Sequence, residues 1–134
     1  MSGGFPADGL ELTHLVVVAD VARSATWYRD VLGATEHRRY EGACVLRLFG
    51  AWMLLVEGGG PTQDKPTVTF APPPDPDVAS AETIFRVPDC RGAYADLASR
   101  GATFLTPPVD RGAETRAFFR DPDGHLFEIS EYRG

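Results

Sequence analysis

Residues 12–35, LTHLVVVADVARSATWYRDVLGAT, and residues 81–103, AETIFRVPDCRGAYADLASRGAT, decide the fold because they repeat one pattern. Each stretch reads as an apolar strand, an aspartate, an amphipathic helix and then Gly-Ala-Thr. Asp20 and Asp89 are suited to begin the helices because a carboxylate accepts hydrogen bonds from the free amides of a first helical turn. The chain is therefore predicted to contain two strand–helix units related by duplication.

Apolar side chains recur at helical spacing between each aspartate and the glycine that follows it. These residues are Ala25, Tyr28, Val31 and Leu32 in the first helix and Ala93, Tyr94, Leu97 and Ala98 in the second. Gly33 and Gly101 stand where a left-handed residue commonly ends a helix. The spacing predicts one helix from Asp20 to Gly33 and another from Asp89 to Gly101.

Short strand-like runs follow each helix. They cover residues 44–49 and 51–57 in the first half and 103–105, 115–120 and 126–130 in the second. The sequence Asp121-Pro122-Asp123-Gly124 predicts a tight turn, because proline fixes one torsion and glycine tolerates a positive one. Each half thus reads as strand, helix and then two or three antiparallel strands, which indicates the α+β class.

The chain divides into two modules, residues 11–57 and 81–132, joined by a connector over residues 58–80. The connector holds three consecutive glycines and six of the eleven prolines, and within it residues 67–70 alternate like a strand. With 134 residues, the whole chain is expected to form one compact domain.

Charge and composition exclude several classes of protein. Asp and Glu outnumber Lys and Arg by 19 to 13, and this acidic balance disfavours nucleic acid as a partner. No stretch of about 18 apolar residues is present to cross a membrane, and residues 1–9 do not read as a secretion signal, so a cytoplasmic location is expected. Cys44 and Cys90 form no metal or redox motif and are expected to be small core residues.

The paired repeat, the helix sequence SATWYRDVLG and the closing sequence FFRDPDGHLFEISE resemble the vicinal oxygen chelate superfamily. That superfamily includes glyoxalase I, bleomycin- and fosfomycin-resistance proteins and extradiol dioxygenases, and the resemblance covers residues 11–132. It implies tandem βαβββ modules that form a curved mixed-sheet cup with helices on the outer face. It also implies a homodimer in which two chains complete the cups.

Many members of that superfamily hold a divalent metal through ligands on the first and last strands of both modules. Carried over position by position, the resemblance implies the ligand set His14, Glu57, Glu82 and Glu128, although the usual histidine is replaced at Glu82. These nitrogen and oxygen donors suit Fe, Mn, Ni, Co or Zn. A metal there would act as a Lewis acid on a substrate with vicinal oxygens, with Glu128 as the catalytic base.

The duplication also allows the strand register to be compared between the halves. Aligning the two helix-capping aspartates places Thr13 opposite Glu82, and aligning the turn glycines places Leu54 opposite Glu128. Side chains alternate faces along a strand, so a one-residue slip turns a ligand away from the cup. A bulge in each of the two first-half strands would be needed to turn His14 and Glu57 toward the same face as Glu82 and Glu128.

Each of the four candidate ligands also has a structural interpretation, as a solvated or hydrogen-bonded residue of a strand. His125 differs in parity from Glu128 and is predicted to be structural or at the rim. Trp52, Phe118 and Phe119 lie on strands whose free face can line the cup, and they are predicted as substrate-pocket residues.

Two functions remain open. The first is a metal-dependent lyase, isomerase or dioxygenase acting on a small molecule with vicinal oxygens. The alternative is a metal-free protein that sequesters a small molecule, like the bleomycin-resistance proteins, and the acidic charge would favour a cationic ligand.

Overall fold

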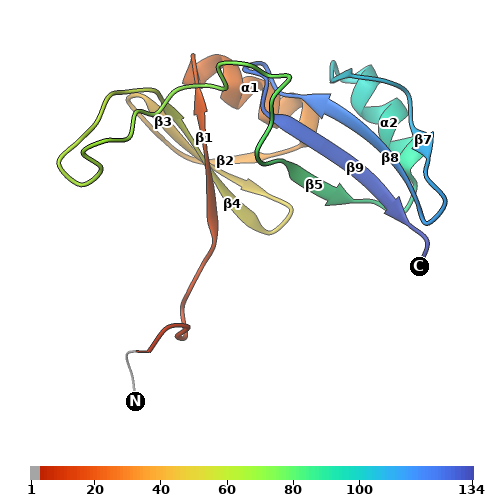
Figure 1. Ribbon diagram of the computed structural model, residues 1–134, viewed down its shortest axis with the longest axis horizontal. Coiled ribbons are helices and arrows are strands. Elements are labelled where there is room, and N and C mark those ends of the chain that lie inside the picture. The colour runs from red at the N-terminus through yellow and green to blue at the C-terminus, as the bar shows by residue number, and fades with distance from the viewer. Residues whose placement is uncertain (1–3) are drawn as a thin grey trace.

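The computed structural model describes residues 4–134 and contains two mixed β-sheets and two helices (Figure 1). The first half holds β1 (Thr13–Val18), α1 (Val21–Leu32), β2 (Thr35–Tyr40), β3 (Ala43–Leu48) and β4 (Ala51–Glu57). The second half holds β5 (Thr83–Arg86), α2 (Cys90–Ser99), β6 (Thr103–Phe104), β7 (Val109–Asp110), β8 (Glu114–Arg120) and β9 (Leu126–Tyr132).

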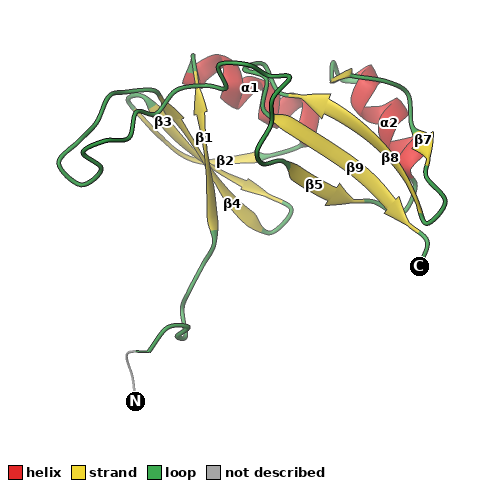
Figure 2. Cartoon of the chain, in the orientation of Figure 1, coloured by secondary structure: helices red, strands yellow, loops and turns green. Residues whose placement is uncertain are grey.

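The two sheets have the same topology, which confirms the predicted duplication and the α+β class. Their strand orders are β1-β4-β3-β2 and β5-β9-β8-β6, with β7 paired to β8. In each sheet the opening strand runs parallel to the closing strand, and the other pairs are antiparallel. Figure 2 shows both helices along one side of the molecule, so each sheet keeps its other face uncovered.

The helix ends follow the local chemistry predicted for them. Asp20 Oδ1 accepts a hydrogen bond of 3.0 Å from the Arg23 amide, and Asp89 Oδ1 accepts one of 3.0 Å from the Gly92 amide. Gly33 ends α1 in the left-handed conformation with φ 76°. A carboxylate at each start and a glycine at the end of α1 therefore fix where the helices lie in the chain.

The core lies between the helices and the sheets and joins the two modules. Tyr28 of α1 packs edge-to-face against Phe127 of β9, and Phe127 stacks on Phe119 at 5.3 Å. Cys44 and Cys90 are fully buried in the same cluster, as the sequence predicted. Tyr28, an aromatic residue of the first module, thus packs against the sheet of the second module.

The short strand β7, the strand β2 and the connector differ from the sequence prediction. β2 was not predicted, because it is an edge strand whose six side chains are all exposed and therefore shows no apolar alternation. Residues 67–70 do not form a strand; Phe70 makes an isolated bridge to Gly59 that folds the connector on itself. Within residues 4–134 no helix is long and apolar enough to cross a membrane.

The turn after β8 ties the second module to the first. Asp123 accepts hydrogen bonds from the Ala19 amide at 2.9 Å and from the Ser24 hydroxyl at 3.3 Å. His125 Nε2 lies 2.7 Å from the Val17 carbonyl oxygen, so this histidine has the structural role predicted for it.

The Tyr28 hydroxyl donates a 2.7 Å hydrogen bond to the buried Asp121 carboxylate. Burial, followed by the Asp121 charge, raises the pKa of Tyr28 well above its usual range.

We expect Tyr28→Phe to lower the free energy of unfolding by about 1–3 kcal/mol, because it removes the donor to a buried carboxylate and keeps the ring. Urea unfolding at pH 7 would measure the loss. Tyr94→Phe is the matched control, since the Tyr94 hydroxyl has no hydrogen-bond partner among residues 4–134 and its ring packs edge-to-face on Phe104. Equal losses for the two variants would contradict a special role for the Tyr28 hydroxyl.

Candidate functional site

The uncovered face of the second sheet carries a cluster of charged and polar side chains. Phe127 and Ile129 of β9 are buried in the core, so the alternation of a strand places Glu128 and Ser130 on the opposite, open face. Phe118 on β8 and Ile84 on β5 are the cross-strand neighbours of Glu128 on that face. The open face of this sheet is therefore centred on Glu128.

Glu128 and Glu82 form a carboxyl pair. Glu128 is only 4% exposed, and Glu82 is the neighbouring carboxyl that acts on it most strongly. Burial of Glu128, followed by its interaction with the neighbouring Glu82 carboxyl, raises the pKa of Glu128 to about 7. Two carboxyls that share a site cannot both ionise easily, so the pair retains a proton close to neutral pH.

Glu114 lies beside this pair, but its pKa is lowered rather than raised. Its carboxylate accepts a 2.8 Å hydrogen bond from the Ser130 hydroxyl and a 3.0 Å hydrogen bond from Arg116. The Ser130 hydrogen bond is the largest cause that lowers the pKa of Glu114. Glu114 is thus a satisfied, charged group, whereas the Glu82–Glu128 pair has spare acceptor capacity for a ligand.

The uncovered face of the first sheet is apolar and aromatic. Thr13 and Leu15 of β1 pair with Trp52 and Leu54 of β4, and these four side chains share one face. The Arg47 guanidinium lies 4.1 Å from the centroid of the Trp52 ring. This face therefore offers a flat aromatic surface.

The predicted ligands of the first module do not lie on this face. His14 pairs with Met53 and Glu57 pairs with Val18, so both follow the phase of the buried, helix-covered side. The Glu57 carboxylate accepts a 3.3 Å hydrogen bond from the Val21 amide at the start of α1. Met53, the partner of His14, is four positions from Glu57 on β4, about 13 Å along the strand.

The proposed metal ligands consequently do not form one group. His14 and Glu82 line a common cavity of ≈170 Å³ at the seam between the sheets, but Glu57 is remote from both. Among residues 4–134, no group of three or more His, Cys, Asp or Glu is arranged to hold a metal ion. Thr13 and Leu54, which have no strong metal-ligating group, lie on the open face as the register comparison indicated. The residues present do not fit the implied metal centre.

The three predicted pocket residues lie in different places. Trp52 is half-buried on the open face of the first sheet, and Phe118 is half-buried beside Glu128 on the second. Phe119 is fully buried in the core, so the structure corrects its predicted place on the pocket wall. Strand alternation separates these adjacent phenylalanines onto opposite faces.

Sequence reasoning missed two groups of residues on the open faces. Glu114 and Arg116 share the parity of Phe118 in the strand ETRAFFR, and that alternation was the signal that would have placed them beside Glu128. Arg47 and His37 flank Trp52 from β3 and β2. No local pattern pointed to His37, because β2 was not recognised as a strand; for Arg47 the signal was its alternation with the buried Leu46 and Leu48 in the predicted strand.

The fold and its open faces define a paired βαβββ protein with one helix on each sheet. Comparison with known families agrees: the model of the Glyoxalase/Bleomycin resistance protein/Dioxygenase superfamily matches residues 11–129. The chain belongs to that superfamily.

Relatives within the superfamily have different activities. The chain is 27% identical over 119 residues to the glutathione transferase FosA of Serratia marcescens, covering 88% of this chain and 78% of that protein. It is 30% identical over 135 residues to biphenyl-2,3-diol 1,2-dioxygenase 3 of Rhodococcus globerulus, covering 88% of this chain but 61% of the dioxygenase. This chain therefore spans less than two thirds of the dioxygenase's length.

Solved structures show the same fold. VPC_CASS1, from the mobile metagenome of V. Pseudocholerae, is 26% identical with a TM-score of 0.70, over 98% of this chain and 100% of that one. TioX from Micromonospora sp. ML1 is 21% identical with a TM-score of 0.72, over 92% and 99% of the two chains. Membership of the superfamily gives the fold, and the chemistry has to be argued from the site.

Proposed function

We propose that this protein binds a small cationic molecule on the open faces of its sheets without a metal. One observation carries the proposal: Thr13 and Leu54 occupy the first-module positions that correspond to Glu82 and Glu128. A hydroxyl and an isobutyl group replace two metal ligands there. The two carboxyls of the second module then remain as acceptors for a ligand rather than as half of a metal centre.

The side chains around these carboxyls indicate the kind of ligand. Trp52 and Ile84 line a common cavity of ≈230 Å³, and Ile84 is the cross-strand neighbour of Glu128. An aromatic ring on one sheet thus shares a cavity with the cross-strand neighbour of Glu128 on the other. A planar cation would stack on the ring and donate hydrogen bonds to the carboxyls.

A second candidate, an enzyme, is favoured by the pKa of Glu128. A carboxyl that titrates at about 7 is matched to proton transfer at neutral pH. In that case the Glu128 carboxylate would take a proton from a substrate bound beside Phe118. The homodimer and the cytoplasmic location expected from the sequence stay predictions.

Proflavine, a planar aromatic cation, is a suitable probe. At a hundredfold excess over its dissociation constant it should stabilise the protein by about 2–3 kcal/mol in thermal melting. Binding should tighten about tenfold from pH 6 to pH 8, because the cation prefers the Glu128 carboxylate once its proton has left. Glu82→Gln with Glu128→Gln should abolish the gain, whereas Glu41→Gln, in an exposed turn, should keep it.

Two results would contradict this proposal. Proflavine binding that is independent of pH and of the double substitution would remove the carboxyl pair from the site. Near-stoichiometric retention of Fe, Mn, Ni, Co or Zn, lost in Glu128→Gln, would favour the metal-dependent enzyme instead.

A further inference from the structure

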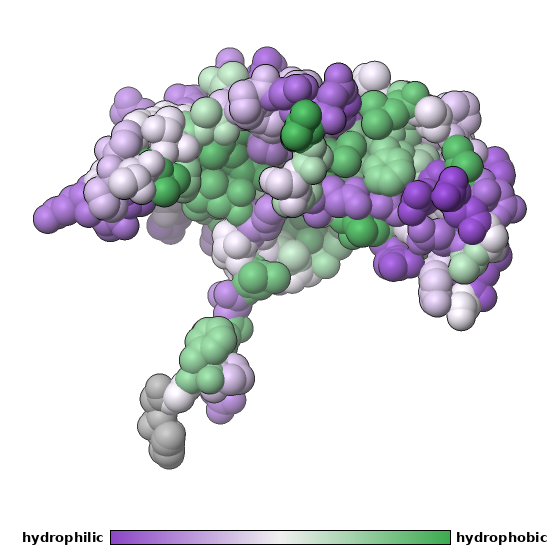
Figure 3. All heavy atoms as spheres, in the orientation of Figure 1, coloured by the Kyte–Doolittle hydropathy of each residue, from purple (hydrophilic) through white to green (hydrophobic). Residues whose placement is uncertain are grey.

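Strand pairing arranges the open face of the second sheet in rows. Ser130 of β9 lies between Arg86 of β5 and Arg116 of β8, which are its two cross-strand partners. Glu128 occupies the adjacent row, two residues back along β9, with an apolar neighbour on either side. We call Ser130 and the two arginines the arginine row; it lies about 7 Å along the strand from the row of the carboxyl. Figure 3 shows hydrophilic side chains gathered at this end of the sheet, where β9 runs to the C-terminus.

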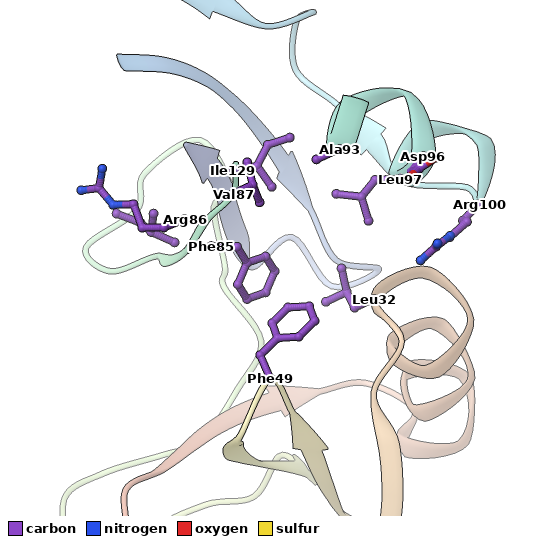
Figure 4. Close-up of a pocket in the computed structure, with 11 residues that line it drawn as sticks. Leu32, Phe49, Phe85, Arg86, Val87, Ala93, Asp96, Leu97, Arg100 and Ile129 are labelled. Carbon is purple, nitrogen blue, oxygen red and sulfur yellow. The ribbon is translucent and has the colours of Figure 1, made fainter. Parts of the chain in front are cut away.

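The Arg86 side chain lies on the open face and not in the apolar cavity behind β5. Figure 4 shows it pointing away from the space between the rings of Phe49 and Phe85. Its Nη1 atom is 3.4 Å from the Ser130 hydroxyl oxygen and 3.8 Å from a carboxylate oxygen of Glu114. The charge of Arg86 therefore acts on the same face as the carboxyl pair.

Both guanidinium groups of the arginine row are held in place by their neighbours. The guanidinium carbon of Arg86 lies 5.2 Å from the centroid of the Tyr132 ring, and that of Arg116 lies 5.5 Å from the Phe118 ring. Arg116 also donates a 3.0 Å hydrogen bond to Glu114. These cation–π and ionic contacts restrict both side chains, so a ligand would lose little affinity in ordering them.

The arginine row carries more positive charge than its own acid neutralises. Within residues 4–134 its ion-pair partner is Glu114, 3.0 Å from Arg116 and 3.8 Å from Arg86. Two guanidinium groups against one carboxylate leave one positive charge. The Arg86 side chain is 61% exposed and that of Arg116 is 35% exposed, so hydrogen-bond donors on both can be reached from the open face. The row is therefore able to accept a second carboxylate or a similar anion.

We propose that the ligand of this protein is a small zwitterion whose anionic group binds the arginine row while its cationic group binds at Glu128. This inference rests on the proposed cation site and adds a second charged subsite to it. The rows lie about 7 Å apart, a separation that one benzene ring with a cation and an anion in para positions can span. A planar carboxylate matches the fork of a guanidinium and can pair with it through two hydrogen bonds.

Electrostatics favours a zwitterion over a simple cation on this face. A cation bound at Glu128 alone would lie about 7 Å from the uncompensated charge of the arginine row, and like charges at that distance repel. An anionic group on the same molecule replaces this repulsion with an ion pair. The arginine row would thus select against cations that lack an anionic group.

The experiment compares 4-amidinobenzoate with 4-amidinobenzamide, in which a neutral carboxamide replaces the carboxylate. Calorimetric titration of the full chain at pH 8 should show the carboxylate compound binding at least about tenfold more tightly, as expected for one added charge-assisted hydrogen bond. Arg86→Gln should remove most of that difference without weakening the carboxamide. Arg91→Gln removes the same charge from an exposed position on α2 and should keep the full difference.

The outcomes separate this inference from the proposed function. Equal affinities for the two compounds, or an equal loss for both in Arg86→Gln, would overturn the anion subsite and leave the cation site standing. Binding of 4-amidinobenzoate that is unchanged in Glu128→Gln would overturn the zwitterion, because its cationic end would then lie elsewhere. If proflavine and both amidines fail to bind wild type, the proposed function fails together with this inference.

Discussion

Phe119→Ala is expected to lower the free energy of unfolding by about 3–5 kcal/mol, because it opens a large cavity in a core that cannot collapse to fill it. Phe119 is fully buried and contacts three aromatic rings, those of Trp27, Phe104 and Phe127. Those contacts join α1 of the first module to the sheet of the second. Urea unfolding followed by both fluorescence and circular dichroism would measure the loss and show whether the two modules still unfold together.

The neighbouring residue provides the control. Phe118→Ala changes the same side chain one position earlier, on the open face beside Glu128, and should cost about 1 kcal/mol or less. It should instead weaken proflavine binding. If the two substitutions destabilise the protein equally, the assignment of these phenylalanines to opposite faces is wrong.

The parts of the fold that the sequence predicted are those specified by local chemistry. Asp20 and Asp89 begin the helices because a carboxylate satisfies the first free amides, and this requires no knowledge of the rest of the chain. The turn before His125 was also predicted from local chemistry, because proline fixes one of its torsions and glycine tolerates a positive one. β2 has neither a buried face nor a turn signal of this strength, so its place in the sheet depends on pairing with β3, which is a tertiary contact.

The candidate site was predicted only in part, for a related reason. Register comparison between the modules indicated that Thr13 and Leu54 correspond to Glu82 and Glu128, because strand parity is a local property. The resemblance placed Glu82 and Glu128 in one ligand set, but the raised pKa of Glu128 was not predictable, since it depends on how deeply the folded sheet buries that side chain. The same holds for the Tyr28–Asp121 hydrogen bond, which spans the modules.

Glu128→Gln is expected to stabilise the protein at pH 8 and to leave it almost unchanged at pH 5. The pKa of Glu128 is raised from 4.5 to about 7 in the folded protein. Between these values the unfolded chain has already lost the proton that the folded chain retains, so wild-type stability falls as pH rises through this range. After allowance for solvent screening, the cost above pH 7 is about 1–2 kcal/mol, which glutamine would remove. That corresponds to a rise in Tm of about 3–6 °C at pH 8.

Glu114→Gln should have the opposite sign and is the matched control on the same face. The pKa of Glu114 is lowered, chiefly by the Ser130 hydrogen bond, so its charge stabilises the folded state above its ordinary pKa and that stability is lost as pH falls. Glu114→Gln should therefore lower Tm at pH 8, with a smaller effect at low pH. Melting curves of both variants and of wild type from pH 4 to pH 8 would show the two trends. A Glu128→Gln protein whose Tm follows that of wild type across this range would show that the carboxyl pair does not hold a proton at neutral pH. The expected pH dependence of cation binding would then have no basis.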